Sequence, residues 1–103
     1  MFRKNHKIIN GRLLQINKSF SQLKQKQKEK ISEWLYQEYA HIYDEVGKPP
    51  NSKRNVEILS AVYNKIEEAE IWIPFYEVEK YFYSRKHRFQ TRYEKAHNIE
   101  QEQ

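Results

Sequence analysis

The chain has 103 residues, 32% of them charged, and a formal net charge of +5 at pH 7. This length predicts one small domain, and 2 Trp, 8 Tyr and 5 Phe supply apolar surface for a small aromatic core despite a mean hydropathy of −1.08. The lack of cysteine excludes disulfides and thiolate metal sites. Because the chain shows neither a membrane-length apolar run nor a secretory signal, it predicts an intracellular protein without a membrane partner.

Cations gather towards both ends of the chain. Residues 1–30 contain nine Lys and Arg against one Glu, residues 31–79 contain four against ten acids, and residues 80–103 contain six against three. Basic segments of this kind indicate a polyanionic partner, above all nucleic acid. A charge run alone is usually a solvated surface, so this interpretation depends on the pattern in which the cations occur.

Residues 1–18 are predicted to form a basic, flexible N-terminal arm. Arg3, Lys4 and Lys7 stand beside a broken set of leucines and isoleucines, and Gly11 interrupts any early helix. The apolar residues favour either a short amphipathic turn that docks on the domain or a contact for another protein. Both interpretations stay open.

A long first helix is predicted from Ser19 onward. Its apolar residues recur near helical spacing; they are Phe20, Leu23, Ile31, Leu35, Tyr39, Ile42 and Val46. Ser19 and Gln22 resemble a capping box at its start. Gly47, followed by Pro49 and Pro50, ends it, because glycine tolerates the left-handed conformation and proline cannot continue a helix.

The second helix is predicted to begin after Asn51 or Ser52, either of which can cap it, and to run to about Glu67. The connection that follows is longer than a tight helix-turn-helix corner. Its residues 71–73, Ile-Trp-Ile, are too apolar for an ordinary solvent loop. They are therefore predicted to tuck under the second and third helices.

The third helix is predicted to run from Pro74, which suits a first helical turn, to about Ala96. Its packing face consists of Val78, Tyr81, Phe82 and Phe89. Another face at the same spacing consists of Lys80, Tyr83, Ser84 and His87. The cations Arg85, Lys86, Arg88, Arg92 and Lys95 follow closely, with only Glu94 opposing them. The folded domain is thus expected over residues 19–97, with a disordered tail at 98–103.

The third helix also resembles a known family. The run Val78-Glu79-Lys80-Tyr81-Phe82-Tyr83-Ser84-Arg85-Lys86-His87-Arg88 is similar to the third helix of the homeodomain, Val-x-x-Trp-Phe-x-Asn-Arg-Arg-x-Lys. The resemblance implies an all-α, three-helix, homeodomain-like (helix-turn-helix) domain, here with a lengthened connection between the second and third helices, whose third helix enters the DNA major groove. Ser84 departs from the family's asparagine, which contacts adenine with two hydrogen bonds, so weaker base specificity is expected.

The candidate contacts follow from this resemblance. The predicted base contacts are Lys80, Tyr83, Ser84 and His87. The predicted phosphate contacts, which add affinity without sequence information, are Arg85, Lys86, Arg88, Arg92 and Lys95 in the helix and Arg3, Lys4 and Lys7 in the arm. For Arg85 an ion pair with Glu33 or Glu38 of the first helix is an equal alternative.

Catalytic chemistry is not indicated by the sequence. The four histidines are scattered without metal-ligand spacing, and two glycines cannot build a phosphate-binding loop. No enzyme activity, metal, cofactor or small-molecule substrate is therefore predicted.

Together with the basic third helix, the resemblance implies a DNA-binding transcription regulator in the nucleus with double-stranded DNA as its partner. A homodimer, or a heterodimer with another DNA-binding protein, is expected because a lone module of this size contacts few base pairs. The small size and the Lys, Asn, Ile and Gln usage also resemble the small mating-type regulators of social amoebae, which implies a role in mating-type determination. The alternatives are a protein-interaction module or small inhibitor that uses the basic helix face, and an RNA-binding domain.

Overall fold

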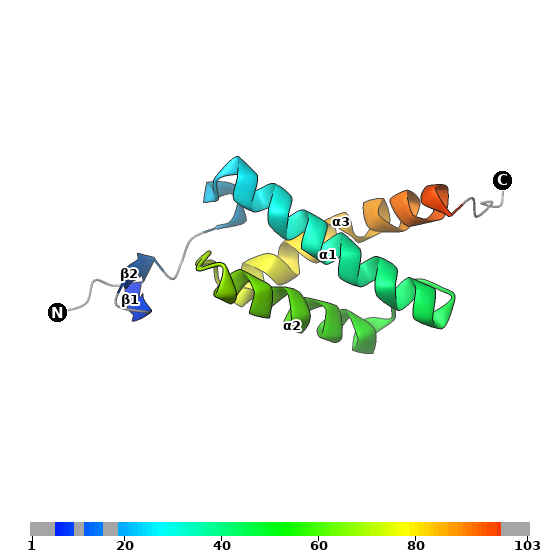
Figure 1. Ribbon diagram of the computed structural model, residues 1–103, viewed down its shortest axis with the longest axis horizontal. Coiled ribbons are helices and arrows are strands. Elements are labelled where there is room, and N and C mark those ends of the chain that lie inside the picture. Colours follow the sequence, from blue (N-terminus) through cyan, green and yellow to red (C-terminus); the bar gives the residue numbers. More distant parts are fainter. Residues whose placement is uncertain (1–5, 10–11, 16–18, 98–103) are drawn as a thin grey trace.

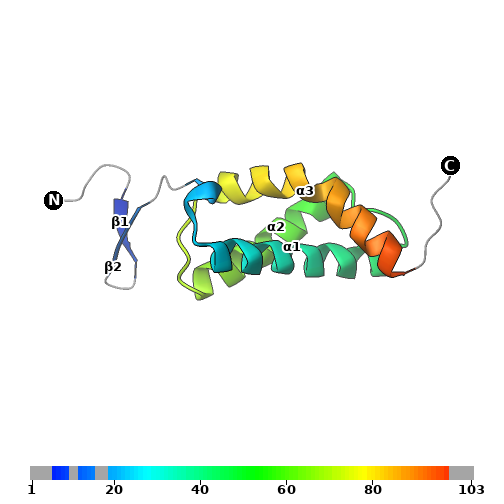
Figure 2. The same cartoon turned by 90° about the horizontal axis from the view of Figure 1, so that it is seen from above.

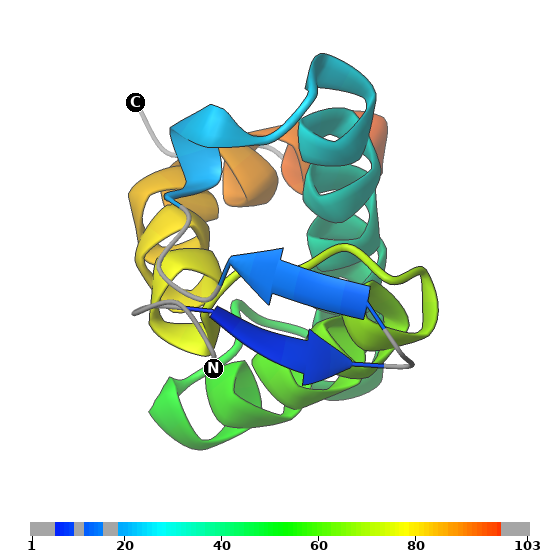
Figure 3. The same ribbon diagram turned by 90° about the vertical axis from the view of Figure 1, so that its left-hand side faces the viewer.

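The computed structural model of the protein describes residues 6–9, 12–15 and 19–97. Its main body consists of α1 (Gln25–Val46), α2 (Ser52–Glu68) and α3 (Phe75–Ala96), preceded by the short 3-10 helix η1 (Phe20–Gln22). In Figure 1, α1 runs from left to right, α2 runs back from right to left, and α3 again runs from left to right. Viewed along the long axis, the three helices surround a common core (Figure 3). The predicted three-helix, all-α class is confirmed for residues 19–97.

A small hairpin precedes the helices. Strands β1 (His6–Ile9) and β2 (Arg12–Gln15) pair antiparallel, with His6 opposite Gln15 and Ile9 opposite Arg12. The hairpin lies at the end of the molecule where α3 begins (Figure 2). The sequence does not predict these strands, because four residues carry too little alternation to be recognised. The flexibility predicted for the arm stays a prediction, and the tail 98–103 lies outside the described residues.

The start of α1 differs from the prediction. Ser19 donates its backbone N–H to Oε1 of Gln22 at 2.8 Å, and this cap closes η1 instead of α1. The helix itself begins only at Gln25. Its end is as predicted: Gly47 takes a left-handed conformation with φ of 77° and donates its N–H to the carbonyl of Tyr43 at 2.7 Å.

Local capping also sets both ends of α2. Asn51 accepts a hydrogen bond from the N–H of Arg54 at 3.0 Å, which confirms the predicted start. At the other end Glu70 adopts a positive φ of 57°, and Ile71 donates its N–H to the carbonyl of Ile66 at 3.1 Å. This backbone reversal is a Schellman motif built without glycine, and it turns the chain back towards the core.

The connection from α2 to α3 is part of the core, as predicted. Ile71 is 5% exposed and Ile73 is completely buried, while Trp72 is half-buried. Tyr63 of α2 donates its hydroxyl to the carbonyl of Ile73 at 2.7 Å, so the extended backbone is also held by a hydrogen bond. The connection therefore fixes the position at which α3 starts.

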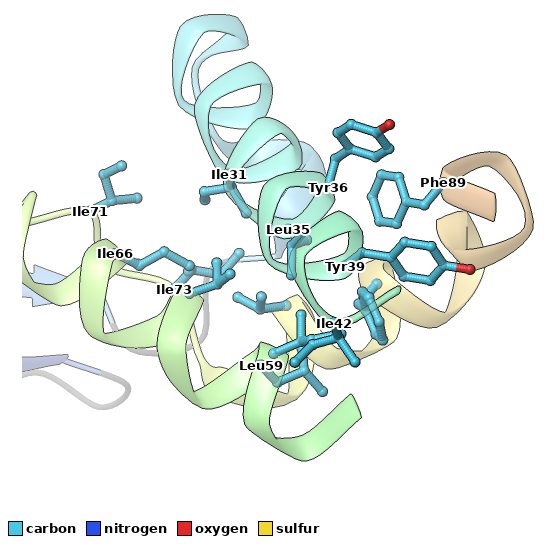
Figure 4. Close-up of a cluster of buried hydrophobic side chains, with 14 of the residues drawn as sticks. Ile31, Leu35, Tyr36, Tyr39, Ile42, Leu59, Ile66, Ile71, Ile73 and Phe89 are labelled. Carbon is cyan, nitrogen blue, oxygen red and sulfur yellow. The ribbon is translucent and has the colours of Figure 1, made fainter. Parts of the chain in front are cut away.

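The core combines aliphatic and aromatic side chains (Figure 4). Ile31, Leu35 and Ile66 meet near the connection, and Phe89 of α3 packs against Tyr36 and Tyr39 of α1 with ring centroids 6.0 Å apart in both pairs. Offset and tilted aromatic pairs of this kind add to the free energy of burial. A small core rich in aromatic residues, as the composition predicts, holds the three helices together.

The last turns of α3 are fastened to the end of α1 by two tyrosines. Tyr43 donates its hydroxyl to Glu94 at 2.7 Å, and Tyr93 donates its hydroxyl to Asp44. Burial and the Glu94 hydrogen bond raise the pKa of Tyr43 to about 12, so its hydroxyl stays protonated as a donor. The two tyrosine rings stack at 4.0 Å, which holds this end of α3 close to α1.

Candidate nucleic-acid interface

The four predicted base contacts share one exposed side of α3. Because Val78, Phe82 and Phe89 are buried against the other helices, the opposite side of α3 faces solvent. Six exposed residues of this side form what is called here the outward stripe; they are Lys80, Tyr83, Ser84, His87, Arg88 and Lys95. The structure thus brings the base-contact candidates together with two of the phosphate-contact candidates.

The outward stripe contains no carboxylate. Glu94 is the only acid of α3 beyond Lys80, and it is 7% exposed, with hydrogen bonds from Tyr43 at 2.7 Å and from Gln90 at 3.2 Å. The sequence places this acid beside the cations, but the packing of α3 on α1 turns it inward. The stripe therefore presents a positive surface.

Two stripe residues, Ser84 and Lys80, have partners within α3, but only Ser84 is restricted by its partner. Ser84 gives its hydroxyl proton to the carbonyl of Tyr81 at 2.7 Å, as serines within helices often do. It is left mainly as an acceptor, which can pair only with the amino groups of adenine and cytosine in the major groove. Lys80 lies 3.2 Å from Glu77, but its side chain is 72% exposed, so this ion pair is weak and its ammonium can turn towards another anion.

Lys86 and Arg92 have partners within the fold. The ammonium of Lys86 donates to the carbonyl of Pro50 at 3.0 Å, and burial lowers its pKa. The guanidinium of Arg92 bonds both carboxylate oxygens of Glu33, at 3.1 and 3.3 Å, and lies 3.7 Å from the ring centre of Tyr36. Although the sequence places both cations with the phosphate contacts, their contacts tie α3 to α1 and to the start of α2.

Arg85 does not form the ion pair that was offered as its alternative role. Glu33 is engaged by Arg92, and Glu38 pairs with Lys65 at 3.5 Å. The guanidinium of Arg85 instead lies 5.4 Å from the ring centre of Tyr81 and is half-buried. An arginine in a cation–π contact of this kind keeps its N–H groups available for an anion.

The arm candidates cannot be placed beside α3. Arg3 and Lys4 lie outside the described residues, and Lys7 belongs to β1. The hairpin lies near the start of α3, whereas the helix carries Arg88 and Lys95 towards its other end (Figure 2). Contacts from the arm to DNA stay a prediction.

A groove of about 820 Å³ between the start of α1 and the first half of α3 was not predicted. Phe20 of η1 stacks on Tyr81 of α3 at 3.9 Å and donates its N–H to Glu77 at 2.9 Å, which joins η1 to α3 beside the groove. That hydrogen bond lowers the pKa of Glu77. The groove is lined by Ser19, Phe20, Ser21, Gln25, Lys28, Glu29, Ser32, Glu33, Glu77, Lys80, Tyr81, Ser84 and Arg85.

One sequence signal for this groove existed. Gln25, Lys28, Glu29 and Ser32 recur at three- and four-residue spacing, which is the polar side of α1. The sequence does not predict that α3 forms the opposite wall, because the contact between η1 and α3 joins residues 57 positions apart.

The comparisons with known proteins give no relative for this chain: no family model, curated protein or solved structure matches it. Within residues 6–9, 12–15 and 19–97, no helix has the length and apolar character needed to span a membrane. Over the same ranges, no group of three or more His, Cys, Asp or Glu side chains is arranged to hold a metal ion.

Proposed function

We propose that this protein is a DNA-binding transcription regulator of homeodomain-like type, which inserts the outward stripe of α3 into the major groove. The observation that carries the proposal is the exposed, carboxylate-free stripe, with Glu94 folded inward beneath it. A positive surface of this kind is attracted to the phosphates of a duplex.

The shape of α3 suits the proposal. The helix has 22 residues and is therefore about 33 Å long at a rise of about 1.5 Å per residue. Only one side of it packs on α1 and α2, so the other side is free to enter a groove about 12 Å wide. Tyr83, Ser84 and His87 lie in the middle of the stripe, where base edges would meet them, and Arg88 and Lys95 lie at its border, where phosphates would.

Specificity is expected to be modest. Ser84 offers mainly an acceptor, and the homeodomain asparagine that recognises adenine has no equivalent among the stripe residues. Useful discrimination would then require a second DNA-binding chain at a composite site. Location in the nucleus and a role in mating-type determination stay predictions that rest on the resemblance.

The test is a titration of the isotope-labelled protein with a short AT-rich duplex at two salt concentrations. Binding through the stripe shifts the amide signals of residues 80–95, and the shifts weaken with salt. Substitution Arg88→Gln should reduce the slope of log affinity against log salt by about 0.9, as should Lys95→Gln. The matched control is Lys48→Gln, an exposed cation in the turn after α1.

Two results would refute DNA binding through α3. One is an unperturbed stripe at low salt. The other is an equal loss of affinity in the Lys48 and Arg88 variants, since that would mean net charge alone drives the association. A single-stranded RNA competitor that binds more tightly than the duplex would instead support the RNA-binding alternative.

A protein-interaction module is the second candidate, and a specific feature favours it. Phe75, Tyr76 and Tyr83 are 38%, 58% and 48% exposed. Tyr76 and Tyr83 are two turns apart on the same side of α3, and exposed aromatic side chains are enriched at protein interfaces. Substitution of Tyr76 by Ser should leave duplex affinity unchanged if the aromatic pair serves a protein partner.

A further inference from the structure

The groove between α1 and α3 borders the outward stripe. Lys80 and Ser84 belong to both surfaces. From the stripe, the groove continues past Arg85 to the opposite wall, where Lys28 and Ser32 of α1 line it. A polyanion lying along one side of α3 would therefore meet cations on both walls.

Two of the groove's cations have no ionic partner in the described part of the chain. Across residues 19–97, no carboxylate lies within ion-pair distance of Lys28 or Arg85, whereas Lys80 pairs with Glu77 and Arg92 pairs with Glu33. Both unpaired side chains are half-buried, so water solvates them less completely than it does a surface lysine. Such groups are poised to bind an anion.

The carboxylates that line the groove are already engaged. Glu77 accepts from the N–H of Phe20 at 2.9 Å and pairs with Lys80 at 3.2 Å. Glu33 forms its two bonds with Arg92, and Glu29 accepts from the side-chain amide of Gln25 at 3.1 Å. Glu77 and Glu33 are thus each paired with a cation, whereas the neutral amide of Gln25 leaves the charge of Glu29 in place. With Arg92 counted, four cations stand against three carboxylates around the groove.

A helix lying in the major groove is flanked on both sides by a sugar-phosphate strand. We infer that the groove between α1 and α3 binds the backbone phosphates of one such strand, with Arg85 and Lys28 contacting them from opposite walls. This inference rests on the proposed function and extends it: α1 becomes part of the interface. The guanidinium of Arg85 lies at cation–π distance, 5.4 Å, from the ring centre of Tyr81, which favours this position of the guanidinium.

The experiment measures affinity for the AT-rich duplex as a function of salt for the full chain and for the Lys28→Gln variant. One lost phosphate contact lowers affinity about eightfold at 0.1 M salt and reduces the slope by about 0.9. The matched control is Lys26→Gln, because Lys26 is exposed on the same helix but does not line the groove. Arg85→Gln is the second variant, and thermal unfolding of all variants confirms that each is folded.

Duplexes with a single neutral methylphosphonate linkage then locate the contact. At the one or two linkages that Lys28 contacts, wild type and Lys28→Gln should bind equally, while elsewhere the difference between them persists. The inference is overturned if Lys28→Gln behaves like Lys26→Gln, or if no linkage removes the difference. In both cases DNA binding itself stands as long as Arg88→Gln still weakens it, so the failure of the groove site and the failure of the proposed function are distinguishable.

Discussion

Ile73→Ala tests whether the connection between α2 and α3 is a structural part of the core. Ile73 is completely buried, and the substitution removes three carbon atoms, or about 2.4 kcal/mol of transfer free energy at about 0.8 kcal/mol per buried methylene. The cavity left behind adds to this cost, so we expect a loss of about 3 to 4 kcal/mol in the free energy of unfolding. For a domain of this size the melting temperature should fall by at least about 12 °C.

Urea unfolding followed by circular dichroism measures this loss. Val56→Ala is the matched control, because Val56 is 59% exposed on α2 and its truncation should change stability by no more than about 0.5 kcal/mol. If Ile73→Ala itself does not fold, Ile73→Val should still cost about 1 kcal/mol. Equal losses for the Ile73 and Val56 variants would refute the view that the connection anchors α3.

Three further predictions concern the contacts that orient α3 and the end of α1. The pKa of Glu77 is lowered in the fold, so its contribution to stability is present above the unfolded value of 4.5 and is lost as pH falls through the folded value. The urea midpoints of wild type and Glu77→Gln should therefore differ at pH 7 and converge as the pH falls below 4.5. Gly47→Ala should lower the free energy of unfolding by about 1 kcal/mol, measured by thermal unfolding, because alanine disfavours a φ of 77°. The cost should not be larger, because an added Cβ meets no atom within 4 Å. The double variant Glu33→Gln with Arg92→Gln keeps the net charge and should keep duplex affinity while losing about 1 kcal/mol of stability; a loss of affinity as large as that of Lys95→Gln would mean that Arg92 contacts phosphate after all.

The helix boundaries were predictable because their causes are local. Gly47 ends α1 and Asn51 starts α2 through the conformation or hydrogen bonds of their own few neighbours. Pro74 marks the start of α3, but it lies in extended conformation just before the helix, which begins at Phe75 and not at Pro74 as predicted. The predicted start of α1 was wrong. Ser19 and Gln22 do form the expected cap, but it belongs to a 3-10 helix, and the sequence does not distinguish that short helix from the α-helix that follows it.

The sequence could not predict which cations of α3 have partners within the described part of the fold and which are exposed without them. Lys86 and Arg92 are of the same residue types as Arg88 and Lys95 and lie in the same part of α3, so sequence alone assigns all of them to phosphates. Their actual partners, Pro50 and Glu33, are 36 and 59 positions away, and only the packing of the helices brings them together. The groove escaped prediction for the same reason, since each wall on its own is an ordinary polar helix side.

These long-range contacts have a consequence for the proposed interface. A rotation of α3 by one residue, about 100°, would bring Val78 and Phe82 towards solvent and carry Lys80 towards the core. Burial opposes that rotation, and Lys86 and Arg92 oppose it further because each bonds to a different element on either side of α3. Under the proposed function, Lys86 and Arg92 would therefore help to decide which other cations of α3 face the nucleic acid. Lys86 and Arg92 would act by orienting α3 and not through their charge. Their substitution should therefore change the base preference of the outward stripe more than it reduces the salt-dependent affinity for phosphates.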